Sequence, residues 1–228
     1  MSKESLEKLN QSLLKHFEEI GVKDAIYYEP IFDYYWSQKD KIGICNLESY
    51  DNENIKGINK ISYKTFLDYW SKAPTIQRSL KIFQAISWIL ENGDSINENI
   101  IKSFDNNMDT KIDNLGCGLY FNLRLTIGNQ VDEDTKAIID FYKDPFYAEY
   151  FRKFIKETEL DMLIITGETG VNKIFPELNL VWSGKEMQAK VYDNVLFCPA
   201  VHPSREGYKQ MADDLNYFFD EYFTKLKK

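Results

Sequence analysis

Three residues of types that could do chemistry each come directly after an apolar run of the chain. Glu48 lies in "NLESYD", Asn122 in "FNLRLT" and His202 in "VHPSREGY". A carboxylate can take a proton or stabilise positive charge, an amide donates and accepts hydrogen bonds at once, and an imidazole exchanges protons near neutral pH. The only other histidine, His16, belongs to an amphipathic segment over 5–20, so His202 is the candidate catalytic imidazole.

The elements that must position these residues are four short apolar runs separated by helical segments. The strands are predicted in "KIGICNL" (41–47), around 118–123, in "LDMLIITG" (160–167) and in "NVLFCPAV" (194–201). Helices are predicted over 5–20, 73–93, 145–158, about 169–175 and 206–226. Alternation of buried strands and helices favours an α/β fold. We therefore expect a single domain over 1–228, a three-layer sandwich whose central, mainly parallel four-stranded sheet is flanked by helices.

The position of the three residues in this fold bears on function, because sites in such sheets lie beyond the carboxyl ends of the strands. Glu48, Asn122 and His202 each follow a predicted strand, so we expect them to share one edge. The aromatic segment "IYYEPIFDYYW" (26–36), within an N-terminal helix and arm over about 1–40, is expected to be a packed surface arm or, alternatively, to line a ligand.

Composition limits the function further. The net charge is −8 and the pI is near 5.0, which argues against a surface built throughout for nucleic acid. The three cysteines, Cys45, Cys117 and Cys198, are scattered and form no metal-binding or disulfide motif. No stretch is long and apolar enough to span a membrane, and a reduced cytoplasmic location is expected.

The three motifs together resemble the uracil-DNA glycosylase superfamily. "FNLRLTI" is similar to that family's strand L-N-x-x-L-T-V, "HPS" matches its last active-site motif, and "NLESY" falls where the family has G-Q-D-P-Y. The order along the chain also agrees, over roughly residues 40–220. The resemblance implies a uracil-DNA glycosylase-like fold and hydrolysis of the N-glycosidic bond of uracil or a related base in nucleic acid, with no metal or cofactor.

The resemblance also assigns a role to each matching residue. Asn122 would recognise the Watson–Crick edge of a base taken out of the stack, and His202 would donate a hydrogen bond to uracil O2 as the base departs. Glu48 would stabilise the positively charged sugar and orient the water. Tyr50 matches the aromatic residue that excludes a 5-methyl group, and Tyr63 is a candidate stacking platform.

Several departures from the family narrow the expected substrate. Asn46 and Ser49 replace the family's glycine and proline, and glutamate replaces its aspartate at position 48. The sequence Arg205-Glu206-Gly207 after "HPS" lacks the apolar wedge that the family inserts into a duplex. Together with the acidic charge, this favours single-stranded or damaged DNA as the partner.

Three further polar residues are candidate phosphate or pocket contacts: Arg124, Ser204 and Arg205. Arg124 is not part of the family motif, and strand alternation places it on the same side as Asn122. It has two alternative roles, a phosphate contact or an ion pair with Glu48.

Two other interpretations of the same residues remain open. "VHPSREGYKQMADDL" also resembles the last block of SGNH-type ester hydrolases, which would make Ser49 the nucleophile and His202 its base. Pro199, however, stands where that family has the aspartate that orients the histidine. The second alternative is a non-catalytic relative that binds a base, a nucleotide or a protein partner.

Overall fold

The computed structural model describes residues 3–30, 32–50, 56–60, 74–104, 118–128, 143–166, 171–182, 188–200 and 207–227. For positions 47–50, 74–76, 124 and 126–128 the description covers the backbone only. Every structural statement below concerns these residues.

The described strands form one seven-stranded sheet in the order β3-β1-β4-β2-β5-β7-β6. Its centre consists of four parallel strands: β2 (Ile42–Tyr50), β4 (Gly118–Gly128), β5 (Met162–Ile165) and β7 (Val195–Pro199). Three short strands extend the edges: β1 (Ala25–Tyr27), β3 (Ile58–Lys60) and β6 (Lys190–Tyr192). β1 runs antiparallel to β4, and β6 runs antiparallel to β7.

The α/β prediction is confirmed, but the predicted four-stranded sheet is too small. The four predicted strands are those of the parallel centre, and the additional three strands are each three residues long. Segments this short show neither an apolar run nor a sustained alternation, which are the signals that identify strands in a sequence. β1 also places the start of the aromatic segment 26–36 in the sheet, and Tyr28 and Tyr35 of this segment are buried in the core.

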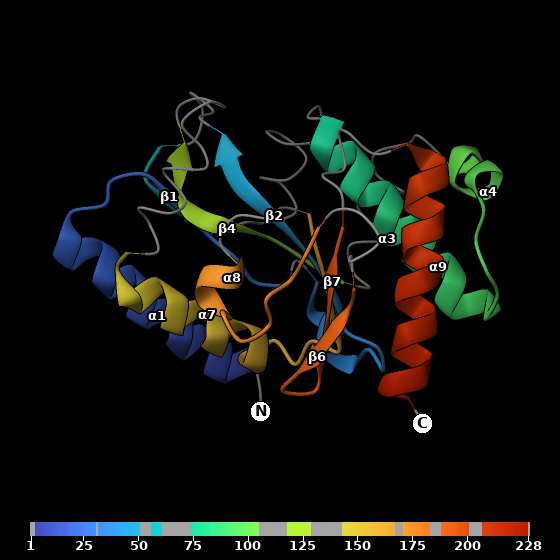
Figure 1. The fold of residues 1–228 in the computed structure, drawn as a ribbon. Helices are drawn as coiled ribbons and strands as arrows, with labels where there is room; N and C mark the ends of the chain where they lie inside the picture. The colour runs from blue at the N-terminus through green and yellow to red at the C-terminus, as the bar shows by residue number, and fades with distance from the viewer. Residues whose placement is uncertain are drawn as a thin grey trace.

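The described helices cover both faces of the sheet. They are α1 (Lys3–Ile20), α3 (Pro74–Asn92), α4 (Glu98–Ser103), α7 (Pro145–Glu157), α8 (Val171–Ile174) and α9 (Tyr208–Lys225), with a 3₁₀ helix at Asp33–Ser37. Figure 1 shows α1 and α7 on one side and α3 and α9 on the other.

Local sequence signals explain where two of these helices begin or end. Pro145 is the first residue of α7, and the carboxylate of Asp144 accepts a hydrogen bond from the Phe146 amide at 2.9 Å, which caps the helix. Gly93 follows α3 with a φ of +66°, a conformation that glycine adopts without strain. Both boundaries agree with those predicted from the sequence.

The alternation of side chains along β4 decides which of them face α3. Phe121 lies on the α7 face, with its ring centroid 5.1 Å from that of Phe154. Gly118 lies on the opposite face, where an added Cβ would be only 2.1 Å from the Phe83 ring of α3. Since side chains alternate with a period of two, Tyr120 and Asn122 lie on the same face as Gly118.

Gly118→Ala is expected to lower the free energy of unfolding by about 1–3 kcal/mol, the usual effect of overpacking a core. The added methyl group would also approach the Ile42 carbonyl oxygen, at 2.7 Å, and a backbone atom cannot rotate away. Urea unfolding would measure the change. Gly207→Ser is the matched control, because position 207 has open space and is the N-cap of α9. Equal stability of Gly118→Ala and the wild type would contradict the packing described here.

Candidate functional site

The carboxyl ends of the four central strands lie along one edge of the sheet and carry a row of buried polar residues. Asn46 of β2 is the register partner of Asn122 of β4. On the other side of β2, Cys45 pairs with Ile165 of β5, and the next residue, Thr166, donates its amide hydrogen to the Cys45 carbonyl at 2.9 Å. Asn122, Asn46 and Thr166 therefore form a row across three neighbouring strands.

We call these three residues, together with Tyr120, the amide row. A chain of hydrogen bonds joins its four members. Thr166 Oγ1 donates to Asn46 Oδ1, and Asn46 Nδ2 donates to the Tyr120 hydroxyl at 2.7 Å. The Tyr120 hydroxyl in turn donates to Asn122 Oδ1 at 3.4 Å. All four residues are buried, with at most 4% of their surface exposed.

Burial of so many polar groups is costly unless they are bonded to one another, because each has left water. The chain of hydrogen bonds from Thr166 to Asn122 offsets that cost and fixes the rotation of the two amides. An amide held in this way can present one defined set of donors and acceptors to a ligand. The amide row is thus suited to recognising a planar polar group at the edge of the sheet.

The backbone register extends the row by one more pair of predicted site residues. Glu48 of β2 is the register partner of Arg124 of β4, two residues beyond the pair Asn46–Asn122. Tyr50 is the partner of Gly128, so the register shifts between Glu48 and Tyr50. Irregularities of this kind are common at the ends of strands next to functional sites. The side chains at positions 48, 50 and 124 lie outside the description.

The other predicted site residues are not described, and their roles stay predictions. These are Tyr63, His202, Ser204 and Arg205. The chain enters the "HPS" motif from the carboxyl end of β7, where the Ala200 amide donates to the Ile165 carbonyl at 2.8 Å. The structure therefore brings Asn122 and the backbone positions of Glu48 and Arg124 together. Ala200, the last described residue before His202, lies at the same edge of the sheet.

Sequence reasoning missed two members of the amide row and misjudged one. In the sequence, Thr166 is part of a predicted strand, Tyr120 has no predicted role, and Asn46 is only a departure from a family motif. The signal was a polar residue at the carboxyl end of three predicted strands. It was hard to use without the register, which decides that Asn46, Asn122 and Thr166 are neighbours.

Two cysteines near this edge are poor candidates for nucleophiles. Cys45 and Cys198 are fully buried, and burial raises the pKa of both thiols well above the usual range. A buried protonated thiol is inert, since the thiolate is the reactive form. In the described part of the chain, no three His, Cys, Asp or Glu side chains gather as metal ligands. No described helix combines the length and hydrophobicity that a membrane crossing requires.

Comparison with known proteins does not assign the chain to a family. No protein-family model matches it, and no curated protein matches its sequence.

Proposed function

We propose that the chain is a divergent uracil-DNA glycosylase-like enzyme, which hydrolyses the N-glycosidic bond of uracil or a related base in single-stranded or damaged DNA. The observation that carries the proposal is the amide row at the carboxyl edge of the parallel sheet, with Asn122 as its terminal member. The "LNxxLT"-like motif around Asn122 and the order of the motifs along the chain add support.

Asn122 is proposed to recognise the base. A side-chain amide can donate to a carbonyl oxygen and accept from a ring N–H at once, which suits the edge of uracil. The Tyr120 hydroxyl donates to Asn122 Oδ1 in the free protein, and a carbonyl oxygen has a second lone pair for a ring N–H. Tyr120 then orients the amide, and Asn46 and Thr166 hold Tyr120.

Glu48 and His202 are proposed to carry the chemistry. Water adds to C1′ of the sugar as the C1′–N1 bond breaks, and the electron pair of that bond leaves with the base. The Glu48 carboxylate stabilises the positive charge that develops on the sugar and takes a proton from the water. His202 donates a hydrogen bond to the base oxygen on which negative charge grows, and the base then takes up a proton.

Arg124 is proposed to keep Glu48 ionised. Their backbone positions are partners in neighbouring strands, which lie about 4.8 Å apart. A guanidinium group beside a carboxyl group favours its charged form. A Glu48 carboxylate kept ionised in this way would act at neutral pH. Arg124 would also be able to contact a phosphate group of the bound strand.

Release of uracil from synthetic oligonucleotides tests the proposal. We expect the purified chain to release the base from a uracil-containing single strand, and to act more slowly on the same strand in a duplex, because the "HPS" segment lacks an apolar wedge. Chromatography of the free base would measure both rates.

Two results would overturn this function. Absence of base release from either substrate, by protein shown to be folded by circular dichroism, would remove the enzymatic claim. Hydrolysis of a chromogenic short-chain ester that Ser49→Ala abolishes would favour the ester hydrolase instead.

A further inference from the structure

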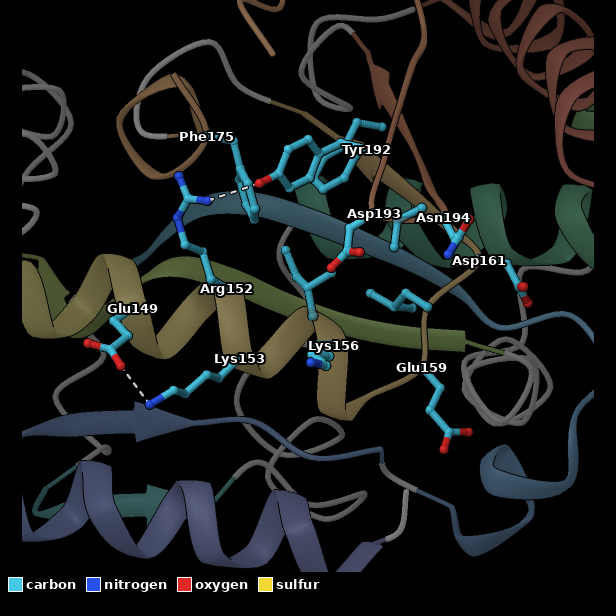
Figure 2. A pocket seen from close by; sticks show the side chains of 14 residues that line it. Glu149, Arg152, Lys153, Lys156, Glu159, Asp161, Phe175, Tyr192, Asp193 and Asn194 are labelled. Carbon is cyan, nitrogen blue, oxygen red and sulfur yellow. Dashed lines mark hydrogen bonds and ion pairs between the residues drawn. The ribbon is translucent and has the colours of Figure 1, made fainter. Parts of the chain in front are cut away.

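A pocket lies at the opposite edge of the sheet from the amide row. Its volume is about 510 Å³, and its walls are α7, the connection from α7 to β5, Phe175 directly after α8, and β6 and β7 with the turn between them (Figure 2). Val195, the first residue of β7, and Asp161, which precedes β5, place it at the amino ends of the parallel strands. A volume of this size is typical of sites for small molecules.

The floor of the pocket is apolar and aromatic. Ile155, Leu160, Val195 and Phe197 are each at most 6% exposed, and Phe175 is 4% exposed. The rings of Phe175 and Phe197 meet edge to face with their centroids 5.1 Å apart. Such a floor favours an apolar group of a ligand, because burying that group removes apolar surface from water.

One wall of the pocket is held in place by Arg152. Its guanidinium group forms two hydrogen bonds with the Glu177 carboxylate, at 3.0 and 3.3 Å, and lies 4.7 Å from the centre of the Phe175 ring. Arg152 lowers the pKa of Glu177 to about 2. On the same helix, Lys153 pairs with Glu149 at 2.6 Å. These charges are already compensated within the protein.

Two charges at the mouth of the pocket have no such compensation. Among the described residues, no side-chain hydrogen bond or ion pair is formed by Lys156 of α7 or by Asp193 of the turn between β6 and β7. Figure 2 shows Lys156 on the helix side of the pocket and Asp193 on the side of the turn. Glu159 and Asp161 also line the pocket, but they pair with Lys41 and Lys227. The mouth thus offers one uncompensated cation and one uncompensated anion above an apolar floor.

We propose that this pocket binds the zwitterion of a hydrophobic α-amino acid, with its side chain on the apolar floor, its carboxylate at Lys156 and its ammonium group at Asp193. A ligand with one charge of a single sign would leave either Lys156 or Asp193 uncompensated. This binding site is independent of the proposed function at the carboxyl edge.

Calorimetric titration of the full chain with L-tryptophan, L-phenylalanine and L-leucine, up to about 10 mM, tests the proposal. We expect saturable binding of at least one of the three amino acids. For that amino acid, the analogue that lacks the carboxylate and the analogue that lacks the ammonium group should each bind about tenfold or more weakly. For L-tryptophan these analogues are tryptamine and indole-3-propionate.

Two variants locate the site. Lys156→Gln keeps a good helix former, and Asp193→Asn suits the positive φ of 50° at this turn position, so both should fold. Each is expected to weaken binding about tenfold or more. Lys15→Gln, an exposed change on α1, is the matched control and should bind as the wild type does. The proposal would be overturned if none of the three amino acids binds, or if both pocket variants bind with wild-type affinity. It would also be overturned if an analogue that lacks the carboxylate or the ammonium group binds as tightly as the amino acid.

Discussion

Glu48→Gln is expected to lower the rate of base release from a uracil-containing single strand by about 10²–10⁴-fold, the usual contribution of a positioned acid–base group. Glutamine has nearly the same size as glutamate but no negative charge, so it neither stabilises the positive sugar nor takes a proton from water. Single-turnover kinetics with excess enzyme would measure the chemical step without product release.

Glu48→Asp is the matched control for this change. It keeps the carboxylate and shifts it by one methylene group, so a loss of no more than about a hundredfold is expected. Arg124→Gln then distinguishes the two alternative roles of Arg124. Loss of an ion pair would lower the rate of the chemical step and leave substrate binding unchanged. Loss of a phosphate contact would weaken binding and its salt dependence instead. Wild-type rates in Glu48→Gln would contradict the catalytic role.

Asn46→Leu is expected to lower the free energy of unfolding by about 2–4 kcal/mol, because it breaks the middle of the amide row. Leucine is close in size, but it removes the acceptor of the Thr166 hydroxyl and the donor to the Tyr120 hydroxyl. Both hydroxyl groups are buried and lose this partner, and what remains to them is longer: the Cys45 carbonyl at 3.3 Å for Thr166 and Asn122 Oδ1 at 3.4 Å for Tyr120. Urea unfolding followed by circular dichroism would measure the loss.

Two further variants test whether the row acts as a unit. Asn99→Leu makes the same substitution at an exposed position of α4 and should change stability by no more than about 0.5 kcal/mol. Thr166→Val removes one hydroxyl group while keeping the shape of the side chain. The double variant Asn46→Leu with Thr166→Val should lose less free energy of unfolding than the sum of the losses in the two single variants, because both substitutions break the same hydrogen bond. Additive losses would contradict the coupling.

The parts of the fold that the sequence predicted are those with strong local signals. The four central strands are apolar runs, and α7 begins at Pro145 with Asp144 as its cap. The short strands β1, β3 and β6 are too short to carry such a signal, and they form because neighbouring strands offer free backbone groups. Tyr28 and Tyr35 are core residues for a similar reason, since their contacts are distant in sequence: Tyr28 packs near Phe121 of β4, and Tyr35 donates to the Thr158 carbonyl that follows α7.

The candidate site was predictable only in part for a related reason. Asn122 and Glu48 stand out because each polar residue follows an apolar run. Asn46 and Thr166 follow such runs as well, but their importance depends on the register that aligns β2 with β4 and β5. Register is set by long-range pairing and not by residue type. The register also makes Glu48 and Arg124 backbone partners. Of the two roles that the sequence leaves open for Arg124, the ion pair with Glu48 can therefore be tested directly.

The most direct test of the central claim is a crystal structure of Glu48→Gln bound to a uracil-containing single strand, since this variant is expected to trap the uncleaved substrate. We predict that the uracil ring lies at the carboxyl edge of β2 and β4, with its polar edge within hydrogen-bond distance of the Asn122 amide. A base bound elsewhere, with the Asn122 amide contacting only protein groups, would contradict the account.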